Sequence, residues 1–415
     1  MSHQIRLRLL PSVRCLFDEP LQVKVSGLRS KQVITMRARS TDETGVLFSS
    51  YATYRADGDG KIDLNRDSSL SGSYTGVEPM GLLSSLKADA FNRYFNKNRA
   101  LKPFTVNFSV HEEEGRMLAE ATNERFLMAD GVVRVPVKEG HLSGALFIPP
   151  GEGPFPAVLD LSSFVSEKRA ALLANKGFIV LSVSVFSDKP YEVTEMHLDR
   201  FEEAVHYLNG LPQVGSKGVG VISRSKAADI ALSLSAFVSG IKAVVWINGC
   251  CANSAYPLYY KTKLIFPGLM FDPKKMIPTI SGAVISKYSI QNHQTEENRA
   301  TVIPIEKANS QFLFVASEDD LSWDSKAYMD EMVERLKRHG KQNFETVSYP
   351  GAGHYLEPPY GPHCPASPHA AARQSVLWGG EPSTHNVAEV HLWEKVQKFF
   401  KAHLSCDAAQ SKPMT

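Results

Sequence analysis

The stretch GVGVISRSKAADIALSLSAF, residues 218–237, restricts the possible folds of this chain more than any other segment. It begins with small or β-branched apolar residues, as in a buried strand, and its second half is rich in Ala and Leu, which favours a helix. Ser223 and Ser225 lie between the two halves. A strand, a sharp turn that carries a serine and a helix form the local pattern of a nucleophile elbow. The glycines that usually flank such a serine are absent here, so either serine is a candidate for the turn.

Ser225 fits the turn better than Ser223. The strained backbone of an elbow requires small residues two positions before and two positions after the nucleophile. Around Ser225 these are Ser223 and Ala227, whereas around Ser223 one of them is the branched Val221. We therefore predict that Ser225 is the nucleophile and that small residues replace the usual glycines. The alternative interpretation is that Ser225 only caps the following helix.

From residue 136 onward, apolar strand-like runs alternate with helical patterns. Near-continuous apolar runs such as FIVLSVSVF are typical of strands that are buried on both faces. Strands are expected within 141–162 and at 178–186, 218–222, 242–248, 310–317 and 344–350, and helices at 166–177, 198–211, 225–237, 325–340 and 391–404. This alternation predicts a mostly parallel sheet with helices on both faces.

The first 135 residues have a different pattern. Alternating apolar and polar residues predict half-buried strands at 21–28, 33–40, 46–56 and 104–113. Several short strands with polar turns predict a β-sandwich. The chain thus divides into an N-terminal β-sandwich domain, residues 1–135, and a C-terminal α/β domain, residues 136–415.

The sequence DGDG at Asp57–Gly60 is expected to form a tight hairpin turn, since Asp-Gly pairs between strands favour such turns. A calcium loop is the competing interpretation. It fails because Lys61 and Ile62 stand where such a loop needs an acid or Asn and then a glycine.

The composition argues against several classes of function. A formal net charge of +2 over 415 residues gives no support for binding nucleic acid or a membrane surface. No apolar run is long enough to span a membrane. Five cysteines without paired spacing fit a reducing compartment.

Address signals give weaker indications of the compartment. The opening MSHQIRLRLLPSVRCLF lacks a signal-peptide pattern, although its three arginines without acids are compatible with a mitochondrial leader. The final KPMT is not a peroxisomal address. We therefore expect a cytoplasmic protein, with the peroxisome and the mitochondrion as alternatives.

Reactive residue types follow three of the predicted strands, at the edge where the sites of open α/β sheets form. In chain order they are Ser225, the neighbours Asp319 and Asp320, and His354. The order serine, acid, histidine is that of the α/β-hydrolases. Histidine can take the serine proton, and a buried carboxylate can orient the imidazole. The pattern predicts this chemistry but does not choose between the two aspartates, which in the alternative interpretation only mark a helix start.

Long, ordered stretches of the chain resemble one known family. They include CLFDEPLQVKVSGL, SLSGSYTGVEPMGLL, VKEGHLSGALFIPPGEGPFPAVLDL, YPGAGHYLEPPYGPHCPAS and WGGEP. Over nearly its whole length the chain is similar to the two-domain acyl-CoA thioesterases and the related bile acid-CoA:amino acid N-acyltransferases. The resemblance implies an N-terminal β-sandwich, a C-terminal α/β-hydrolase domain and a triad of Ser225, Asp320 and His354. It selects Asp320 over Asp319.

The chain departs from this family after the predicted strand that ends near Asp160. Relatives carry a glycine-rich loop there, whereas this chain has the glycine-free DLSSFVSEKRAALLA. In this fold, one N–H group of the oxyanion hole comes from the residue after the nucleophile, here Lys226, and another from a loop after an early strand. The second donor is therefore expected among Ser162, Ser163 and Phe164.

The resemblance implies an acyl-CoA thioesterase that hydrolyses fatty acyl-CoA to free fatty acid and CoA through an acyl-enzyme. Two alternatives stay open. One is an acyl-CoA:amino acid N-acyltransferase, in which glycine or taurine takes the acyl group. The other is an acyl-CoA-binding protein whose catalysis is weakened by the missing glycines. The expected partner is a small-molecule acyl-CoA, and the chain is expected to be a monomer or a weak homo-oligomer.

No cofactor is expected, because CoA is part of the substrate, and no metal. His363, His369 and His385 lack the ordered spacing of a metal site. Cys250 and Cys251 follow a predicted strand, where buried packing explains them better than a reactive thiol. The segments FVSEKR, YYKTKLIFPGLMF and PHCPASPHAAARQ offer apolar and basic groups for an acyl-CoA, and the sequence does not decide among them.

Overall fold

The structure, a computed structural model, describes residues 4–406. The KPMT ending and the first three residues of the segment considered as a leader lie outside the described residues. The arginine-bearing stretch Arg6–Leu10 forms strand β1, which pairs with β3 (Gln22–Ser26). This part of the segment is thus a strand of the first sheet.

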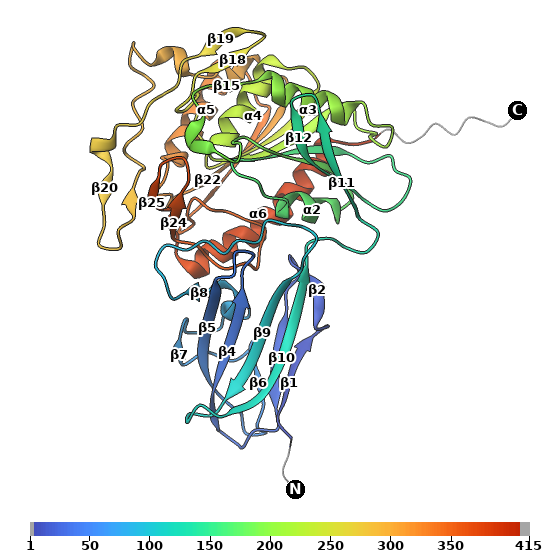
Figure 1. Cartoon of the computed structure of the whole chain (residues 1–415), viewed down its shortest axis with the longest axis vertical. Coiled ribbons are helices and arrows are strands. Elements are labelled where there is room, and N and C mark those ends of the chain that lie inside the picture. Colours follow the sequence, from blue (N-terminus) through green and yellow to red (C-terminus); the bar gives the residue numbers. More distant parts are fainter. Residues whose placement is uncertain (1–3, 407–415) are drawn as a thin grey trace, which may run out of the picture.

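Two sheets build the N-terminal region (Figure 1). The smaller sheet has the order β1, β3 and β6 (Ile62–Asp63). The larger sheet contains β2 (Arg14–Leu16), β10 (Met117–Phe126), β9 (Phe104–His111), β4 (Val33–Thr41), β5 (Leu47–Arg55) and β7 (Ser71–Gly72), and β8 (Lys87–Ala88) also pairs with β5. Buried residues of both sheets, such as Val25 and Met36, belong to one apolar core. The predicted β-sandwich is confirmed.

The turn at Asp57–Gly60 forms, but it does not close a hairpin. Oδ1 of Asp57 accepts the N–H groups of Asp59 and Lys61, both at 2.9 Å, which is a local turn that Asp favours. The strands on its two sides pair with different partners, because β5 pairs with β4 and β6 pairs with β3. The hairpin prediction was wrong, since the chain crosses here from one sheet of the sandwich to the other.

The C-terminal region is organised around one long sheet. Its order is β11 (Val133–Glu139), β12 (Leu142–Ile148), β14 (Ile179–Ser184), β13 (Ala157–Ser162), β16 (Val219–Arg224), β17 (Ile241–Ile247), β22 (Gln311–Ser317) and β23 (Phe344–Tyr349). Neighbouring strands are parallel from β14 to β23, and only the pairings of β12 are antiparallel. The mostly parallel sheet is confirmed. The predicted domain division after residue 135 falls within β11 and stays a prediction.

Helices cover both faces of this sheet (Figure 1). Helices α2 (Lys168–Ala174) and α6 (Pro382–His403) share an apolar core with the sandwich, and α3 (Asp199–Asn209), α4 (Lys226–Phe237) and α5 (Ser325–Arg338) pack in the core on the other face. Apart from Lys242, strand β17 is apolar, and its packing explains why. Val245 faces the first core and the neighbouring Val244 and Trp246 face the second, so both faces are buried.

Two parts of the region depart from the sequence prediction. Helix α6 begins at Pro382, well before the predicted start at His391, because Pro suits the first turn and the first residues are too polar to give an apolar pattern. Short strands that the sequence did not indicate form two small sheets, namely β15 (Met196–His197), β18 (Leu258–Tyr260) and β19 (Lys263–Phe266), and β20 (Ile277–Pro278), β21 (Val284–Ile285), β25 (Gln374–Leu377) and β24 (Ala366–His369). The remaining α-helix, α1 (Gly81–Ser84), is a single turn.

No helix within residues 4–406 combines the length and the apolar character that crossing a membrane requires.

Candidate active site

Ser225 lies at the junction between β16 and α4 with an unusual backbone conformation. Its φ is 61° and its ψ is −132°, a backbone conformation that residues other than glycine rarely adopt. The serine takes the N-cap position of α4, but its hydroxyl makes no capping hydrogen bond. The structure therefore has the backbone of a nucleophile elbow and does not support the interpretation of Ser225 as a capping side chain.

The flanking small residues permit this conformation. Ser223 and Ala227 are both fully buried at 0% exposure, so a larger side chain at either position would have to displace packed neighbours. The hydroxyl of Ser223 donates to the carbonyl oxygen of Val245 on β17 at 2.9 Å. Ser223 is thus a structural residue of the sheet, whereas Ser225 lines a cavity.

His354 and Asp320 form a buried pair beside the same cavity. Nδ1 of His354 lies 2.8 Å from Oδ2 of Asp320, and each residue is 1% exposed. Oδ1 of Asp320 accepts the N–H groups of Ser322 and Trp323, and its Oδ2 also accepts the hydroxyl of Ser325 at 2.6 Å. The carboxylate is therefore held in place from several sides and can fix the orientation of the imidazole.

The neighbouring Asp319 points elsewhere. Its Oδ2 accepts the N–H of Gly380 at 2.7 Å, in the loop before α6. The structure thus brings Asp320, rather than Asp319, to His354.

Two tryptophans enclose the His354 ring, and sequence reasoning did not identify either. The imidazole stacks on Trp378 at a ring separation of 5.3 Å and on Trp323 at 6.4 Å. The two aromatic faces pack against the imidazole and restrict the orientation of its ring. The only available signal was that Trp323 follows Asp320 closely and that Trp378 opens the WGGEP stretch.

Asn248, also missed, ties three segments of the site together. It directly follows β17 and has a positive φ of 48°. Its Nδ2 donates to the carbonyl oxygen of His354 at 2.9 Å and to the hydroxyl of Ser317 at 3.0 Å, at the end of β22. A polar residue after a buried strand was the signal that could have indicated it.

The predicted oxyanion residues lie around Ser225. Lys226 is the first residue of α4, and the first N–H groups of a helix have no partner within it. Ser162 and Ser163 line the same cavity as Ser225. Their carbonyl oxygens accept the N–H groups of Val185 and Phe186 at 2.8 and 2.9 Å, which fixes this glycine-free loop against the end of β14.

The side chain of Lys226 belongs to a buried network. Its Nζ donates to Oδ2 of Asp229 at 2.9 Å, to Oδ1 of Asn253 at 3.1 Å and to the carbonyl oxygen of Ser254 at 2.7 Å. Burial raises the pKa of Asp229, while Lys226 and Ser254 oppose that shift. The network anchors the start of α4 to the loop after β17.

The cavity beside Ser225 and His354 has a volume of about 770 Å³. Aromatic residues form much of its wall, namely Phe164, Phe186, Tyr256, Phe271, Trp323 and Trp378. Arg93, Tyr94, Asn96 and Asn98 also line it, and they come from the segment that follows β8 in the N-terminal region. A cavity of this size with a largely aromatic wall suits an extended apolar ligand.

No hydrogen bond joins the Ser225 hydroxyl to His354 among the described side-chain contacts. Catalytic hydrogen bonds are commonly long in unliganded enzymes and shorten when substrate is bound. Both residues line one cavity, so the structure brings them together without forming the bond.

Most basic residues near Ser225 are already paired. Arg224 donates to Oε1 of Glu357 at 3.2 Å, and Nζ of Lys168 lies 3.0 Å from Oε2 of the same glutamate. Arg169 pairs with Asp160 at 2.6 Å. Burial alone would raise the pKa of Glu357, but Lys168 and Arg224 lower it to about 2. Lys168 and Arg169 of the FVSEKR segment therefore form ion pairs within the fold.

The three segments considered for acyl-CoA contacts contribute unequally to the cavity. FVSEKR supplies its first three residues, and PHCPASPHAAARQ supplies 367–374. YYKTKLIFPGLMF contributes only its last residue, Phe271. Arg373 and Arg93 are the exposed cations of the cavity wall.

The sheet with its crossover helices, together with the strained serine between β16 and α4, defines the α/β-hydrolase class. Two family models match the chain. One, described as acyl-CoA thioester hydrolase/BAAT N-terminal region, covers residues 18–139, and the other, BAAT/acyl-CoA thioester hydrolase C terminal, covers residues 196–406. The chain belongs to this acyl-CoA thioester hydrolase/BAAT family, as the resemblance in its sequence indicated.

Relatives match over nearly the whole length. Acyl-coenzyme A thioesterase 6 of Homo sapiens is 41% identical over 96% of this chain and 97% of the relative. Acyl-coenzyme A thioesterase 5 of Mus musculus is 41% identical over 97% of this chain and 98% of the relative. Acyl-coenzyme A thioesterase 2, mitochondrial, of Rattus norvegicus is 40% identical over 96% of this chain and 89% of the relative.

Proposed function

We propose that this chain is a serine-type acyl-CoA thioester hydrolase with Ser225, His354 and Asp320 as its triad. The observation that carries the proposal is the strained Ser225, which shares one cavity with a His354–Asp320 pair. Relatives of about 40% identity that are named acyl-coenzyme A thioesterases support the choice of substrate.

The proposed reaction has two halves. His354 takes the proton of Ser225 as the serine oxygen bonds to the thioester carbonyl carbon. The carbon–sulfur bond then breaks, and the CoA sulfur leaves with the proton held by His354. In the second half, His354 takes a proton from water as the water oxygen bonds to the acyl-enzyme carbonyl carbon. The carbon–oxygen bond to Ser225 then breaks, and the proton held by His354 passes to the serine oxygen as the fatty acid leaves. Asp320 holds the imidazole tautomer and stabilises its charged form in both halves.

We propose that the oxyanion of each tetrahedral intermediate is bound by the N–H of Lys226 and by an N–H of the loop Ser162–Phe164. Hydrogen-bond donors fixed by the fold stabilise developing charge without reorganisation. The attachment of the loop to β14 supports the idea that this glycine-free segment is rigid enough for the role.

The substrate we propose is a small-molecule fatty acyl-CoA, with the acyl chain against the aromatic wall and the CoA phosphates near the exposed Arg93 and Arg373. We propose that no cofactor takes part in hydrolysis. We further propose a cytoplasmic monomer or weak homo-oligomer. The five free cysteines support a reducing compartment, and size-exclusion chromatography with light scattering and cell fractionation test these two points.

The deciding experiment measures release of CoA thiol from a panel of acyl-CoAs by the wild type, Ser225→Ala and Ser223→Ala. We expect Ser225→Ala to lose about 10,000-fold or more in kcat/KM, because the nucleophile is removed. Ser223→Ala is the matched control. It should keep most activity, since Ser223 only bonds to Val245.

Product analysis with added glycine or taurine separates hydrolysis from transfer. Free fatty acid as the sole acyl product supports the hydrolase, and an N-acyl conjugate would identify an N-acyltransferase. Full activity in Ser225→Ala would refute the triad. Binding of acyl-CoA without CoA release from the wild type would identify a binding protein instead.

A further inference from the structure

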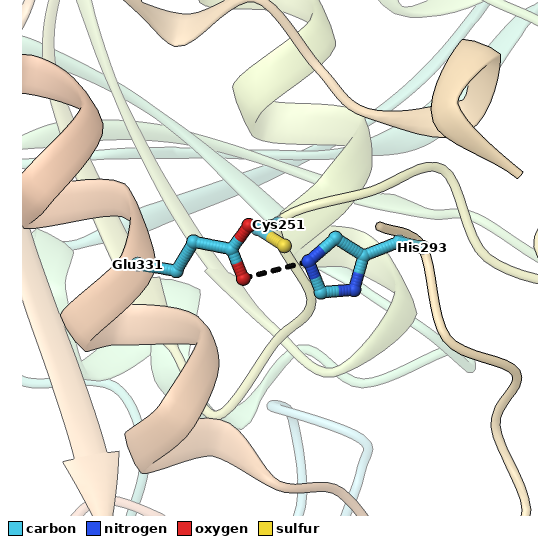
Figure 2. Close-up of side chains that lie close together, drawn as sticks. All are labelled: Cys251, His293 and Glu331. Atoms are coloured by element: carbon cyan, nitrogen blue, oxygen red, sulfur yellow. Dashed lines mark hydrogen bonds and ion pairs between the residues drawn. The ribbon is translucent and has the colours of Figure 1, made fainter. Parts of the chain in front are cut away.

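Three potential metal ligands converge outside the proposed active site. Cys251 lies in the loop after β17, His293 in the segment between β21 and β22, and Glu331 on α5. One ligand atom of each lies within 4.8 Å of the others, and Nε2 of His293 is 2.6 Å from Oε2 of Glu331. Figure 2 shows the three side chains pointing toward one another from separate parts of the backbone.

The donor set suits zinc. Zn²⁺ in proteins is bound by Cys sulfur, His nitrogen and carboxylate oxygen in tetrahedral geometry. With the usual bond lengths, the ligand atoms of such a site are about 3.4–3.8 Å apart. The His293–Glu331 separation of 2.6 Å is below that range and the other separations are at most 4.8 Å, so side-chain shifts of about an ångström would complete the geometry. A site made only of oxygen ligands would instead suit magnesium or calcium.

The surroundings of the cluster favour a cation. Cys251 and His293 are buried, at 3% and 7% exposure, and Glu331 is half-buried. A divalent cation bound here would offset the negative charges that a thiolate and a carboxylate carry.

Other groups around the cluster are already engaged. Arg335 is the neighbouring cation, and its guanidinium bonds to Glu306 at 2.6 and 2.9 Å. The ring of Tyr328 packs edge-on against His293 at 5.7 Å. Sγ of Cys250 accepts the N–H of Ala252 at 3.4 Å, so Cys250 is held in a local turn and is not among the converging ligands.

We propose that Cys251, His293 and Glu331 bind one Zn²⁺ ion, with a water molecule in the fourth position. On binding, the S–H bond of Cys251 breaks, its proton passes to solvent and a sulfur–zinc bond forms, with no change of oxidation state. This proposal replaces the expectation of no metal, which rested on His363, His369 and His385. It does not depend on the proposed hydrolysis.

The role of this ion is structural. It links the loop after β17 and the segment around His293 to α5, whose first residue, Ser325, bonds to Asp320. An ion that binds only the folded chain stabilises it and raises its melting temperature. The ion is not needed for the chemistry at Ser225.

The test uses the full chain, purified with reductant and freed of metal by a chelator. Zn²⁺ is added and the bound metal is counted by elemental analysis after dialysis, and Co²⁺ serves as a spectroscopic probe. We expect one ion per chain, a thiolate-to-cobalt charge-transfer band and a rise of several degrees in melting temperature that the chelator reverses.

Variants then assign the ligands. Cys251→Ser should abolish the charge-transfer band, and His293→Gln and Glu331→Gln should weaken Zn²⁺ binding by about 100-fold or more. Cys250→Ser and Cys364→Ser are matched controls for a neighbouring and a distant buried thiol, and both should bind the ion like the wild type. Far less than one ion per wild-type chain, or an undiminished band in Cys251→Ser, would overturn the proposal. The wild-type measurements stand even if a ligand variant fails to fold.

Discussion

Asp319 and Asp320 are neighbours in the chain, yet their carboxylates have different partners. Asp320 bonds to His354 and accepts three further hydrogen bonds from its own loop and from the first residue of α5, while Asp319 accepts the N–H of Gly380. Comparing substitutions of these two aspartates therefore tests the proposed triad directly.

Asp320→Asn is expected to lower kcat for CoA release by about 1,000- to 10,000-fold, because an amide stabilises neither the correct imidazole tautomer nor its charged form. The melting temperature should change little, since Asn keeps the shape of the side chain. Steady-state kinetics with one saturating acyl-CoA and a thermal melt measure both effects.

Asp319→Asn is the matched control and should keep kcat within about tenfold, because its carboxylate does not reach His354. Equal losses in the two variants would show that Asp320 has no special role.

At the scale of elements, the start of α4 combines a strained residue with a buried ion pair. Ser225 holds a backbone conformation that costs of order 1–3 kcal/mol, which the surroundings must offset. The buried network of Lys226 with Asp229, Asn253 and Ser254 fixes the first turn of α4 directly after this residue. The network is therefore positioned to maintain the elbow.

Lys226→Met is expected to lower the free energy of unfolding by about 3–5 kcal/mol, because it leaves Asp229 as an uncompensated buried charge. Adding Asp229→Asn should recover part of the loss. Denaturant unfolding of the single and double variants measures this coupling.

Lys326→Met provides the comparison with an exposed pair. Lys326 and Asp330 are 2.7 Å apart on the surface of α5, with side-chain exposures of 41% and 58%. Loss of this ion pair should lower the free energy of unfolding by at most about 1 kcal/mol. A Lys226→Met variant as stable as Lys326→Met would contradict the stabilising role of the buried network.

At the scale of the whole molecule, the sandwich and the sheet domain are in close contact (Figure 1). Nε1 of Trp393 on α6 donates to Asp18 of the sandwich region at 2.8 Å, and the N–H of His363 donates to the carbonyl oxygen of Ser84 in α1. The same contact brings Arg93 and Tyr94 into the cavity wall. The candidate site is thus a joint product of both regions.

This contact makes stability depend on pH. Burial, and to a lesser extent the charge of His385, lowers the pKa of His363 from 6.5 to about 4. The unfolded chain takes up this proton near pH 6.5, whereas the folded chain does so only near pH 4. The contribution of neutral His363 is therefore complete above pH 6.5 and is lost as the pH falls toward 4.

Relative to His363→Gln, the wild type should lose about 1 kcal/mol more of its unfolding free energy between pH 7 and pH 5. Urea unfolding at the two pH values measures the difference. Comparison with the variant is essential, because the raised pKa values of the buried Glu389 and Asp229 act in the opposite direction. Equal pH dependence in both proteins would contradict the prediction.

Local patterns in the sequence predicted much of this molecule. Near-continuous apolar runs such as 178–186 located buried strands, and alternating runs such as 33–40 located half-buried ones, because side-chain burial follows the period of each element. The small residues around Ser225 predicted the elbow in the absence of glycines, since the steric requirement is local. Reasoning from local sequence failed at Asp57–Gly60. The turn depends on neighbouring residues, but its flanking strands pair with different strands elsewhere in the chain.

The sequence by itself determined the two fold types and predicted Ser225 and His354 as site residues, because each of these patterns depends on residues close together in the chain. Only the tertiary structure showed the tryptophans around His354, the link through Asn248, the cavity wall from the N-terminal region and the meeting of Cys251, His293 and Glu331. These contacts join residues far apart in sequence. Their formation depends on how the sheets and helices pack, which no local pattern encodes.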